Sequence, residues 1–293
     1  MPDAPSLTGG RFWLILGAVF SAMTLIVLGD TAGKALTQHG VPPLYVAWAR
    51  FTLGALIALP FCGLRRAELP LLTHRKIILR GLLIGSGVAC IVTALSTEPL
   101  ADVFGAFFVG PIVSYILAAL FLREPITRWR SALLAMGFAG VLLVVKPGFG
   151  AGPGMVFALL AGVFYGAFLA MTRAVAGQYR PRFLILTQLG YAAALLMPVP
   201  VLLSAPALTP WLTLLFVVSA LCSAGGNLFL VWANRQAPAS VIAPLIYTQL
   251  IAATILGWLA FGDWPDAVAF AGLAVIFLSG ILSLRAAGRE GRR

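Results

Sequence analysis

The sequence is poor in charged residues and in the side chains that catalysis or metal binding requires. Only 10% of its 293 residues are charged, and it has nine acidic residues, two histidines and three cysteines. Cys62, Cys90 and Cys222 show no metal or redox spacing, and His39 and His74 fall in separate loops. No segment carries paired carboxylates or a His/Glu cluster. We therefore expect no enzyme, no bound metal and no cofactor.

Apolar residues are abundant instead. They make up 61% of the chain, too much for a soluble globule. A helix needs roughly 20 apolar residues to cross a bilayer. Ten segments are predicted to do so, at residues 12–32, 43–63, 77–97, 99–122, 129–145, 153–173, 183–203, 210–232, 239–261 and 266–284. The expected fold is an all-α integral membrane protein whose main partner is the lipid bilayer.

The net charge of +11 is spread along one side of the predicted membrane protein. Most Lys and Arg residues fall in loops on the same side as the N-terminus, so the positive-inside rule places both termini in the cytoplasm. Basic residues distributed in this way do not form a nucleic-acid patch. We expect a retained first helix rather than a signal peptide. A monomer is expected, with self-association left open.

The ten segments form two similar sets of five, at residues 12–145 and 153–284. At an offset of about 139 residues, Leu82, Gly87, Ala94, Pro99, Ile116, Leu117 and Leu120 return as Leu221, Gly226, Ala233, Pro238, Ile255, Leu256 and Leu259. The acidic Glu124 returns as Asp263. Because five is odd, the second copy must be inverted in the membrane. Inverted repeats of this kind are the architecture of secondary transporters, with a site at their interface.

Polar residues at membrane depth are the first candidates for that site, because they are costly in hydrocarbon. In the third segment Ser86, Cys90, Thr93 and Thr97 share one helix face. Asn227 and Trp232 lie in the corresponding eighth segment. These residues fit either helix packing or the lining of a cavity.

Aromatic residues near mid-membrane give a second set of candidates. Phe108 corresponds to Tyr247, and Ser21 corresponds to Tyr165 at an offset of about 144 residues. A tyrosine at this depth needs a partner for its hydroxyl group, which favours a water-filled cavity. Pro111 and Pro244 predict kinks beside it. The predicted substrate-binding set is Ser21, Ser86, Thr93, Phe108, Tyr165, Asn227, Trp232 and Tyr247.

Four charged residues form a predicted gate or ion-pair group. Arg50 lies roughly 10 Å along the second helix from its outer end, at 1.5 Å per residue. Asp30 is expected at a comparable depth, one turn before Lys34, and Glu98 or Asp102 is an alternative partner of Arg50. The group suits either a structural ion-pair cluster or a gate that contacts a substrate carboxylate.

Several short motifs within this doubled unit carry a family resemblance. They are Lys34 near the end of the first segment, Arg50-Phe51 in the second, and the acidic-proline endings Glu124-Pro125 and Asp263-Trp264-Pro265. In this order they resemble the EamA repeats of the drug/metabolite transporter superfamily, in particular bacterial inner-membrane exporters of amino acids, aromatic ones included. The resemblance implies a central cavity lined by helices one, three, four, six, eight and nine. The second copy departs from the pattern, since about Gln188 fills the place of Arg50.

The expected function is export of amino acids, apolar and aromatic ones included, across the cell inner membrane by alternating access. No candidate carboxylate is central in the membrane, which favours facilitated diffusion. The alternatives are a carrier of other small metabolites or cationic drugs, possible proton coupling, a channel, and a structural scaffold.

Overall fold

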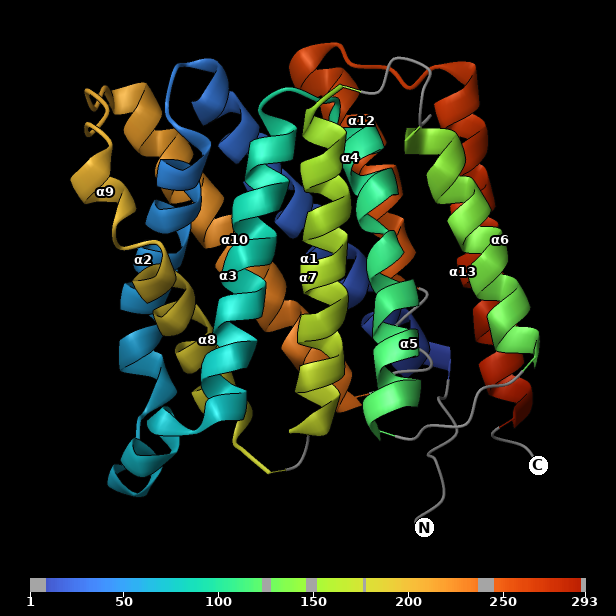
Figure 1. Cartoon of the computed structure of the whole chain (residues 1–293), viewed down its shortest axis with the longest axis horizontal. Coiled ribbons are helices and arrows are strands. Elements are labelled where there is room, and N and C mark those ends of the chain that lie inside the picture. The colour runs from blue at the N-terminus through green and yellow to red at the C-terminus, as the bar shows by residue number, and fades with distance from the viewer. Residues whose placement is uncertain (1–8, 123–127, 146–151, 176–177, 237–244, 291–293) are drawn as a thin grey trace.

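The computed structural model describes residues 9–122, 128–145, 152–175, 178–236 and 245–290. All regular elements within these ranges are helices (Figure 1). They are α1 (Gly9–Gln38), α2 (Pro43–Cys62), the 3₁₀ helix η1 (Arg66–Thr73), α3 (Arg75–Leu95), α4 (Leu100–Phe107), α5 (Val109–Leu122), α6 (Arg128–Val145), α7 (Gly154–Ala174), α8 (Pro181–Leu195), α9 (Val199–Leu202), α10 (Pro210–Gln236), the 3₁₀ helix η2 (Leu245–Tyr247), α12 (Thr248–Phe261) and α13 (Ala267–Glu290).

Seven helical segments are long and apolar enough to cross a membrane. They are Trp13–Gln38, Pro43–Cys62, Arg75–Leu95, Leu100–Phe121, Gly154–Ala174, Pro181–Leu202 and Pro210–Leu230. Shorter apolar helices occupy Ser131–Val144, Thr248–Phe261 and Ala267–Leu282. The chain is thus an all-helical membrane protein, and each apolar run predicted from the sequence contains helix.

The helix bounds differ from the prediction where the backbone leaves helical geometry. The fourth predicted segment divides at Phe108, whose ψ of 2° ends α4. Pro111 does not kink the helix interior, because it falls in the first turn of α5, where its missing N–H group costs little. The seventh segment divides between Leu195, where α8 ends, and Val199, where α9 begins after its N-cap residue Pro198. Pro244 and Glu124-Pro125 lie outside the described residues.

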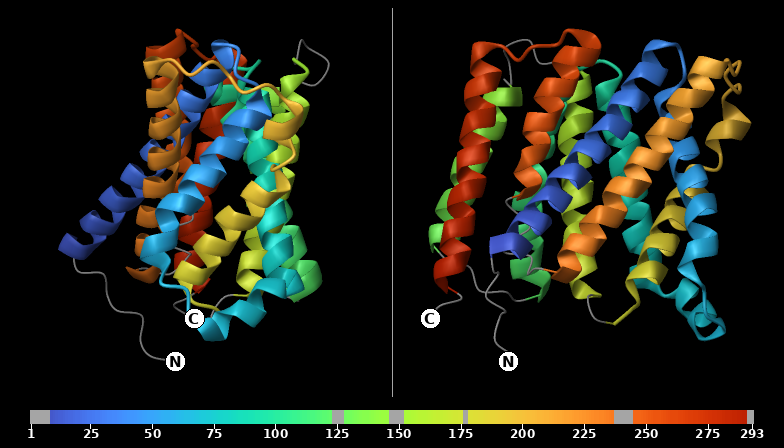
Figure 2. Two further views of the ribbon diagram at one scale, coloured as in Figure 1. Left: turned by 90° about the vertical axis from the view of Figure 1, so that its left-hand side faces the viewer. Right: turned by 180° about the vertical axis from the view of Figure 1, so that it is seen from behind.

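The first half of the chain (residues 9–145) packs mainly against the second half (residues 152–290). The most extensive contacts join α1 to α10, α6 to α13, and α3 to α7. Figure 2 shows α1 beside α10, and α6 beside α13, from two further directions. The two halves are therefore interleaved rather than placed side by side.

Glycines allow the backbones of the two halves to approach closely. A β-carbon added to Gly140 of α6 would lie 2.8 Å from the carbonyl oxygen of Gly272 in α13. One added to Gly272 would lie 2.7 Å from the carbonyl oxygen of Gly140. Lipid tails are as apolar as the side chains, so the hydrophobic effect does not bring helices together inside a membrane. Small residues at helix crossings are a common basis of packing there, because they allow close van der Waals contact.

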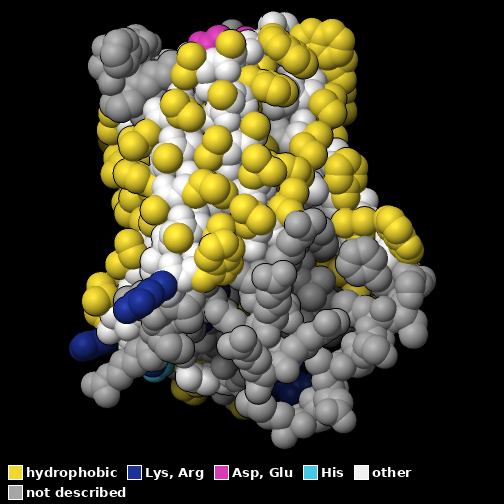
Figure 3. Space-filling view, turned by 90° about the vertical axis from the view of Figure 1, so that its right-hand side faces the viewer, with side chains coloured by type: hydrophobic (Ala, Val, Ile, Leu, Met, Phe, Trp, Pro, Cys, Tyr) yellow, Lys and Arg dark blue, Asp and Glu magenta, His cyan; other side chains and the backbone are white. Residues whose placement is uncertain are grey.

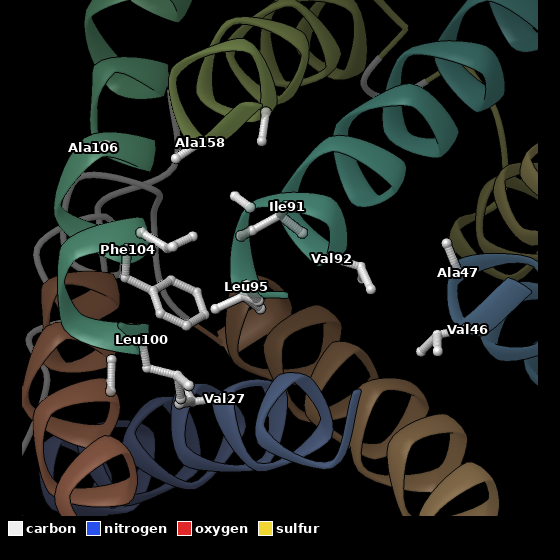
Figure 4. Close-up of a cluster of buried hydrophobic side chains, with 14 of the residues drawn as sticks. Val27, Val46, Ala47, Ile91, Val92, Leu95, Leu100, Phe104, Ala106 and Ala158 are labelled. Carbon is white, nitrogen blue, oxygen red and sulfur yellow. The ribbon is translucent and has the colours of Figure 1, made fainter. Parts of the chain in front are cut away.

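One part of the buried core lies between α1, α3 and α4. Val27, Ile91, Leu95, Leu100 and Phe104 converge there (Figure 4). The outer surface is also apolar, and Figure 3 shows hydrophobic side chains over most of one face, with Lys and Arg near the lower end. The lower end is the end at which α1 begins and α13 ends in Figure 1; the upper end is where α1 ends.

Candidate functional site

A buried arginine joins three helices near the upper end. Arg50 of α2 is 6% exposed and donates to the carboxylate of Asp30 in α1. Its Nη2 donates to the carbonyl oxygen of Gly29 at 2.9 Å and to Oγ of Ser219 in α10 at 3.0 Å. A β-carbon on Gly33 would lie 3.0 Å from this Nη2, so the guanidinium packs closely against this glycine. The ion pair predicted between Arg50 and Asp30 is present, and Ser219 is a partner that the sequence did not indicate.

Lys34 makes a second, partly buried ion pair at the same end. Its Nζ lies 2.7 Å from Oδ2 of Asp263, which follows α12, and 2.9 Å from the carbonyl oxygen of Glu98. It also lies 4.7 Å from the centre of the Phe261 ring. The single cluster expected around Asp30 and Lys34 is thus divided into two pairs, because Lys34 reaches the end of α12 while Asp30 meets α2.

The two alternative carboxylates of the predicted gate lie near this end as well. Glu98 precedes α4, and its Oε1 accepts a hydrogen bond from the backbone N–H of Gly154 at 3.1 Å. Asp102 lies in the first turn of α4 and is half-buried. The carboxylate that Arg50 contacts is that of Asp30.

A row of aromatic rings lies deeper, where α4, α5, α7 and η2 meet. We call Phe107, Phe108, Tyr165, Phe168 and Tyr247 the aromatic row. The ring centres are 4.8 Å apart between Phe108 and Tyr247, 4.9 Å between Phe107 and Tyr165, 5.9 Å between Tyr165 and Phe168, and 6.4 Å between Phe107 and Phe108. The structure therefore brings together three residues of the predicted site from distant parts of the chain.

Two other predicted residues meet elsewhere. Ser21 and Trp232 line a groove of about 630 Å³ between α1 and α10. The remaining lining residues are Leu14, Ala18, Gly225, Leu228 and Phe229. Because Leu14 is 58% and Leu228 is 60% exposed, this groove opens at the outer surface of the molecule.

Three predicted residues belong to neither group. The Oγ1 atom of Thr93 donates to the carbonyl oxygen of Ala89 at 2.8 Å, and Nδ2 of Asn227 donates to that of Ser223 at 2.8 Å. Each bond lies within its own helix, so each polar group finds its partner one turn earlier on the same helix. Ser86 is half-buried on α3.

A second buried arginine lies toward the lower end. Arg80 of α3 is 5% exposed and donates to Oγ1 of Thr172 (2.9 Å), the carbonyl oxygen of Leu184 (2.8 Å) and Oε1 of Gln188 (2.9 Å). Its guanidinium carbon lies 4.7 Å from the centre of the Phe168 ring. Arg80 falls within the predicted segment 77–97 but was not among the predicted site residues. The sequence does contain a signal that indicates Arg80, because the repeat offset of about 139 residues aligns it with Ser219, a partner of Arg50.

An ion pair outside the membrane segments joins the two halves at the lower end. Arg180, before α8, donates to both carboxylate oxygens of Glu68 in η1, at 2.6 and 2.7 Å. This pairing lowers the pKa of Glu68 from its ordinary 4.5 to about 2. The same bonds raise the pKa of Arg180 above its ordinary value.

The buried charges and the aromatic rings of the described residues lie at different depths. Within the described ranges, no three His, Cys, Asp or Glu side chains gather as a metal site would require. Buried cations lie toward both ends, and the aromatic row lies between them. Polar groups placed at these depths are typical of pathways for solutes.

Comparison with known proteins identifies the family and the relatives that this sequence resembles. The sequence model of the EamA-like transporter family matches residues 8–146 and 152–285. Similar proteins include a riboflavin transporter of Rhizobium johnstonii, 27% identical over 97% of this chain and 93% of that protein. A S-adenosylmethionine uptake transporter of Rickettsia bellii is 28% identical (91% and 90% of the two chains), and a pseudopaline exporter of Pseudomonas aeruginosa is 27% identical (90% and 93%).

A solved crystal structure has a similar fold. Its protein is 20% identical to this chain, the TM-score is 0.63, and the match covers 96% of this chain and 99% of the other. At this identity the likeness concerns the fold alone.

Proposed function

Because the chain belongs to the EamA-like transporter family, we propose that it is a secondary transporter that exports amino acids, apolar and aromatic ones included, by alternating access. Named transporters among its relatives support a small-molecule cargo. The observation that carries the amino-acid assignment is the aromatic row, because stacked rings at membrane depth offer an apolar wall to a flat side chain.

In this proposal ten helices cross the cytoplasmic membrane as two inverted five-helix repeats, 12–145 and 153–284. The helix contacts support such a two-fold relation. Contact of α1 with α10 corresponds to contact of α7 with α3, and contact of α2 with α10 corresponds to contact of α8 with α3. The beginning of α1 and the end of α13 lie at one end of the bundle, as an even number of crossings requires (Figure 1). We assign that end to the cytoplasm on the positive-inside rule.

The two ion pairs at the upper end act as the outer gate in this proposal. Arg50 links α1, α2 and α10, and Lys34 links α1 to the end of α12. The Arg50–Asp30 pair lies within the first half, whereas the Lys34–Asp263 pair and the hydrogen bond from Arg50 to Ser219 cross between the two halves. Rocking of one half against the other has to break these two crossing contacts, and breaking and remaking them would open and close the outer end.

The proposed binding residues remain those of the sequence analysis. Phe108, Tyr165 and Tyr247 supply the apolar wall, and Trp232 joins them only if the halves move. Ser21, Ser86, Thr93 and Asn227 would satisfy the polar groups of the zwitterion. Asp30 is neutralised by Arg50, which favours facilitated diffusion over proton exchange.

Flux measurements on purified protein in liposomes test this function. We expect saturable exchange of labelled phenylalanine that an imposed pH gradient does not change. Phe108→Ala should raise KM about fivefold, because a stacked ring is lost. Phe121→Ala removes an exposed ring from α5 and is the matched control. Absence of amino-acid flux, or equal KM in both variants, would contradict the proposal.

A carrier of other small metabolites is the second candidate. It is favoured by the relatives, whose names indicate cargoes other than amino acids. Competition against phenylalanine exchange by unlabelled metabolites and cationic drugs separates the two candidates. Flux driven by the pH gradient would add proton coupling.

A further inference from the structure

The two buried arginines both lie in the first half, and each contacts a residue of the second half that is equivalent, in the repeat, to the position of the other arginine. Arg80 of α3 aligns with Ser219 of α10 at the repeat offset, and Gln188 of α8 aligns with Arg50 of α2. The contact between Arg50 and Ser219 (3.0 Å) and the contact between Arg80 and Gln188 (2.9 Å) are therefore equivalent. In each contact one residue is arginine and the other is neutral.

The two ends differ in the countercharge. At the upper end Asp30 of α1 supplies a carboxylate to Arg50. The position equivalent to Asp30 in α7 is Ala174, at the offset of about 144 residues, and the hydrogen-bond acceptor that α7 contributes to Arg80 is the Thr172 hydroxyl group. All three acceptors of Arg80 are neutral, and the described side chains place no carboxylate in ion-pair contact with it.

A guanidinium cannot relieve this cost by losing its proton. A buried charge is normally paired, and one without a countercharge at membrane depth marks a functional position. Three of the five N–H groups of Arg80 donate to the neutral acceptors, which leaves two outside this set of bonds.

We propose that Arg80 binds the carboxylate of the transported solute. That carboxylate would be the countercharge of Arg80, as the carboxylate of Asp30 is the countercharge of Arg50. This inference rests on the proposed function, since it requires a solute between the halves, and it restricts the solute to organic anions and zwitterions with a carboxylate.

The surroundings of Arg80 also define the rest of the solute. Phe168 lies against the guanidinium at 4.7 Å and stacks on Tyr165, which continues through Phe107 to Phe108 and Tyr247. The cation thus stands at one end of the aromatic row. A carboxylate at Arg80 would place an attached flat apolar group against these rings.

Thermal unfolding of the full-length protein in detergent tests the inference with benzoate and its neutral analogue benzamide, at constant ionic strength. Benzoate should raise Tm and benzamide should not. Arg80→Gln should weaken benzoate binding about tenfold or more, because a charge-assisted hydrogen bond is lost. Arg75→Gln removes an exposed charge from the same helix and should bind benzoate like the wild type.

Gln188→Glu gives a second test that keeps Arg80 in place. The new carboxylate would lie where Oε1 of Gln188 now accepts from Arg80, so it should neutralise the arginine and abolish benzoate binding without loss of folding. Equal stabilisation of the wild type, Arg80→Gln and Gln188→Glu by benzoate would overturn the inference, as would no stabilisation of the wild type. Benzoate binding through Arg80 without amino-acid flux would support the site and refute amino-acid export alone.

Discussion

At the scale of single residues, the charges buried in the membrane determine which substitutions the protein tolerates. Arg50 has one acidic partner, Asp30, and neutral partners at Gly29 and Ser219. Removing one member of a buried pair leaves the other charge uncompensated, which costs more than removing both. The pair is therefore a coupled unit.

Asp30→Asn should accordingly lower the free energy of unfolding by about 3 kcal/mol or more, because Arg50 loses its countercharge. The double variant Asp30→Asn/Arg50→Gln should be more stable than Asp30→Asn alone. Ser219→Ala, which removes a neutral partner, should cost only about 1 kcal/mol. Tm of the purified variants measures this, and a double variant as unstable as the sum of the single changes would refute the coupling.

Depth along the helices is the part of a contact that the sequence indicates. Counting residues along two helices put Arg50 and Asp30 at a comparable depth, with Glu98 or Asp102 as alternative partners, and the two side chains are in contact. The repeat offset gave Phe108 and Tyr247 only as equivalent positions, and their stacking was not predicted. The pairing of Lys34 with Asp263, 229 residues away, was missed. It depends on how far each helix is rotated about its axis and on where the end of α12 lies, and neither follows from the spacing of residues.

At the scale of helices, close backbone contact organises the packing. A β-carbon on Gly162 of α7 would lie 2.6 Å from the carbonyl oxygen of Phe107, and one on Gly166 would lie 2.8 Å from Cβ of Val113 in α5. The apolar runs predicted where helices occur but not where they divide. The fourth predicted segment divides at Phe108, three residues before Pro111, which was expected to kink it.

Gly166→Ala should therefore destabilise the protein by about 1 to 3 kcal/mol, because the added methyl group meets backbone that cannot move aside. Gly190→Ala in α8 is the matched control. It has no atom within 4 Å of the added carbon and should be neutral or stabilising by up to about 1 kcal/mol. Tm values of the two variants give the comparison, and an equal effect would argue against tight packing of α5 on α7.

At the scale of the whole molecule, the two halves stabilise each other. The largest helix contacts all cross between them, and so does the ion pair between Glu68 and Arg180. Neither half buries its packing surfaces without the other, so the molecule should unfold as one unit.

The contribution of Glu68 to the stability of the folded protein should depend on pH. Its pKa in the folded protein is about 2, below the ordinary 4.5, so the ion pair stabilises the fold above pH 4.5 and this stabilisation is lost as the pH falls toward 2. Glu68→Gln should have a lower Tm than the wild type at pH 6, and the difference should shrink steadily below pH 4.5. A difference that stays constant down to pH 3 would show that the carboxylate is not paired.

The interleaving of the halves has a consequence for biosynthesis. Arg50 follows Asp30 by 20 residues, so its countercharge is already made when it enters the membrane. All hydrogen-bond partners of Arg80 are synthesised after it, and the last of them, Gln188, comes 108 residues later. At a translation rate of about 5–20 residues per second this delay is roughly 5–20 s. During that interval the nascent chain carries a bare cation that only water, lipid headgroups or the insertion machinery can solvate.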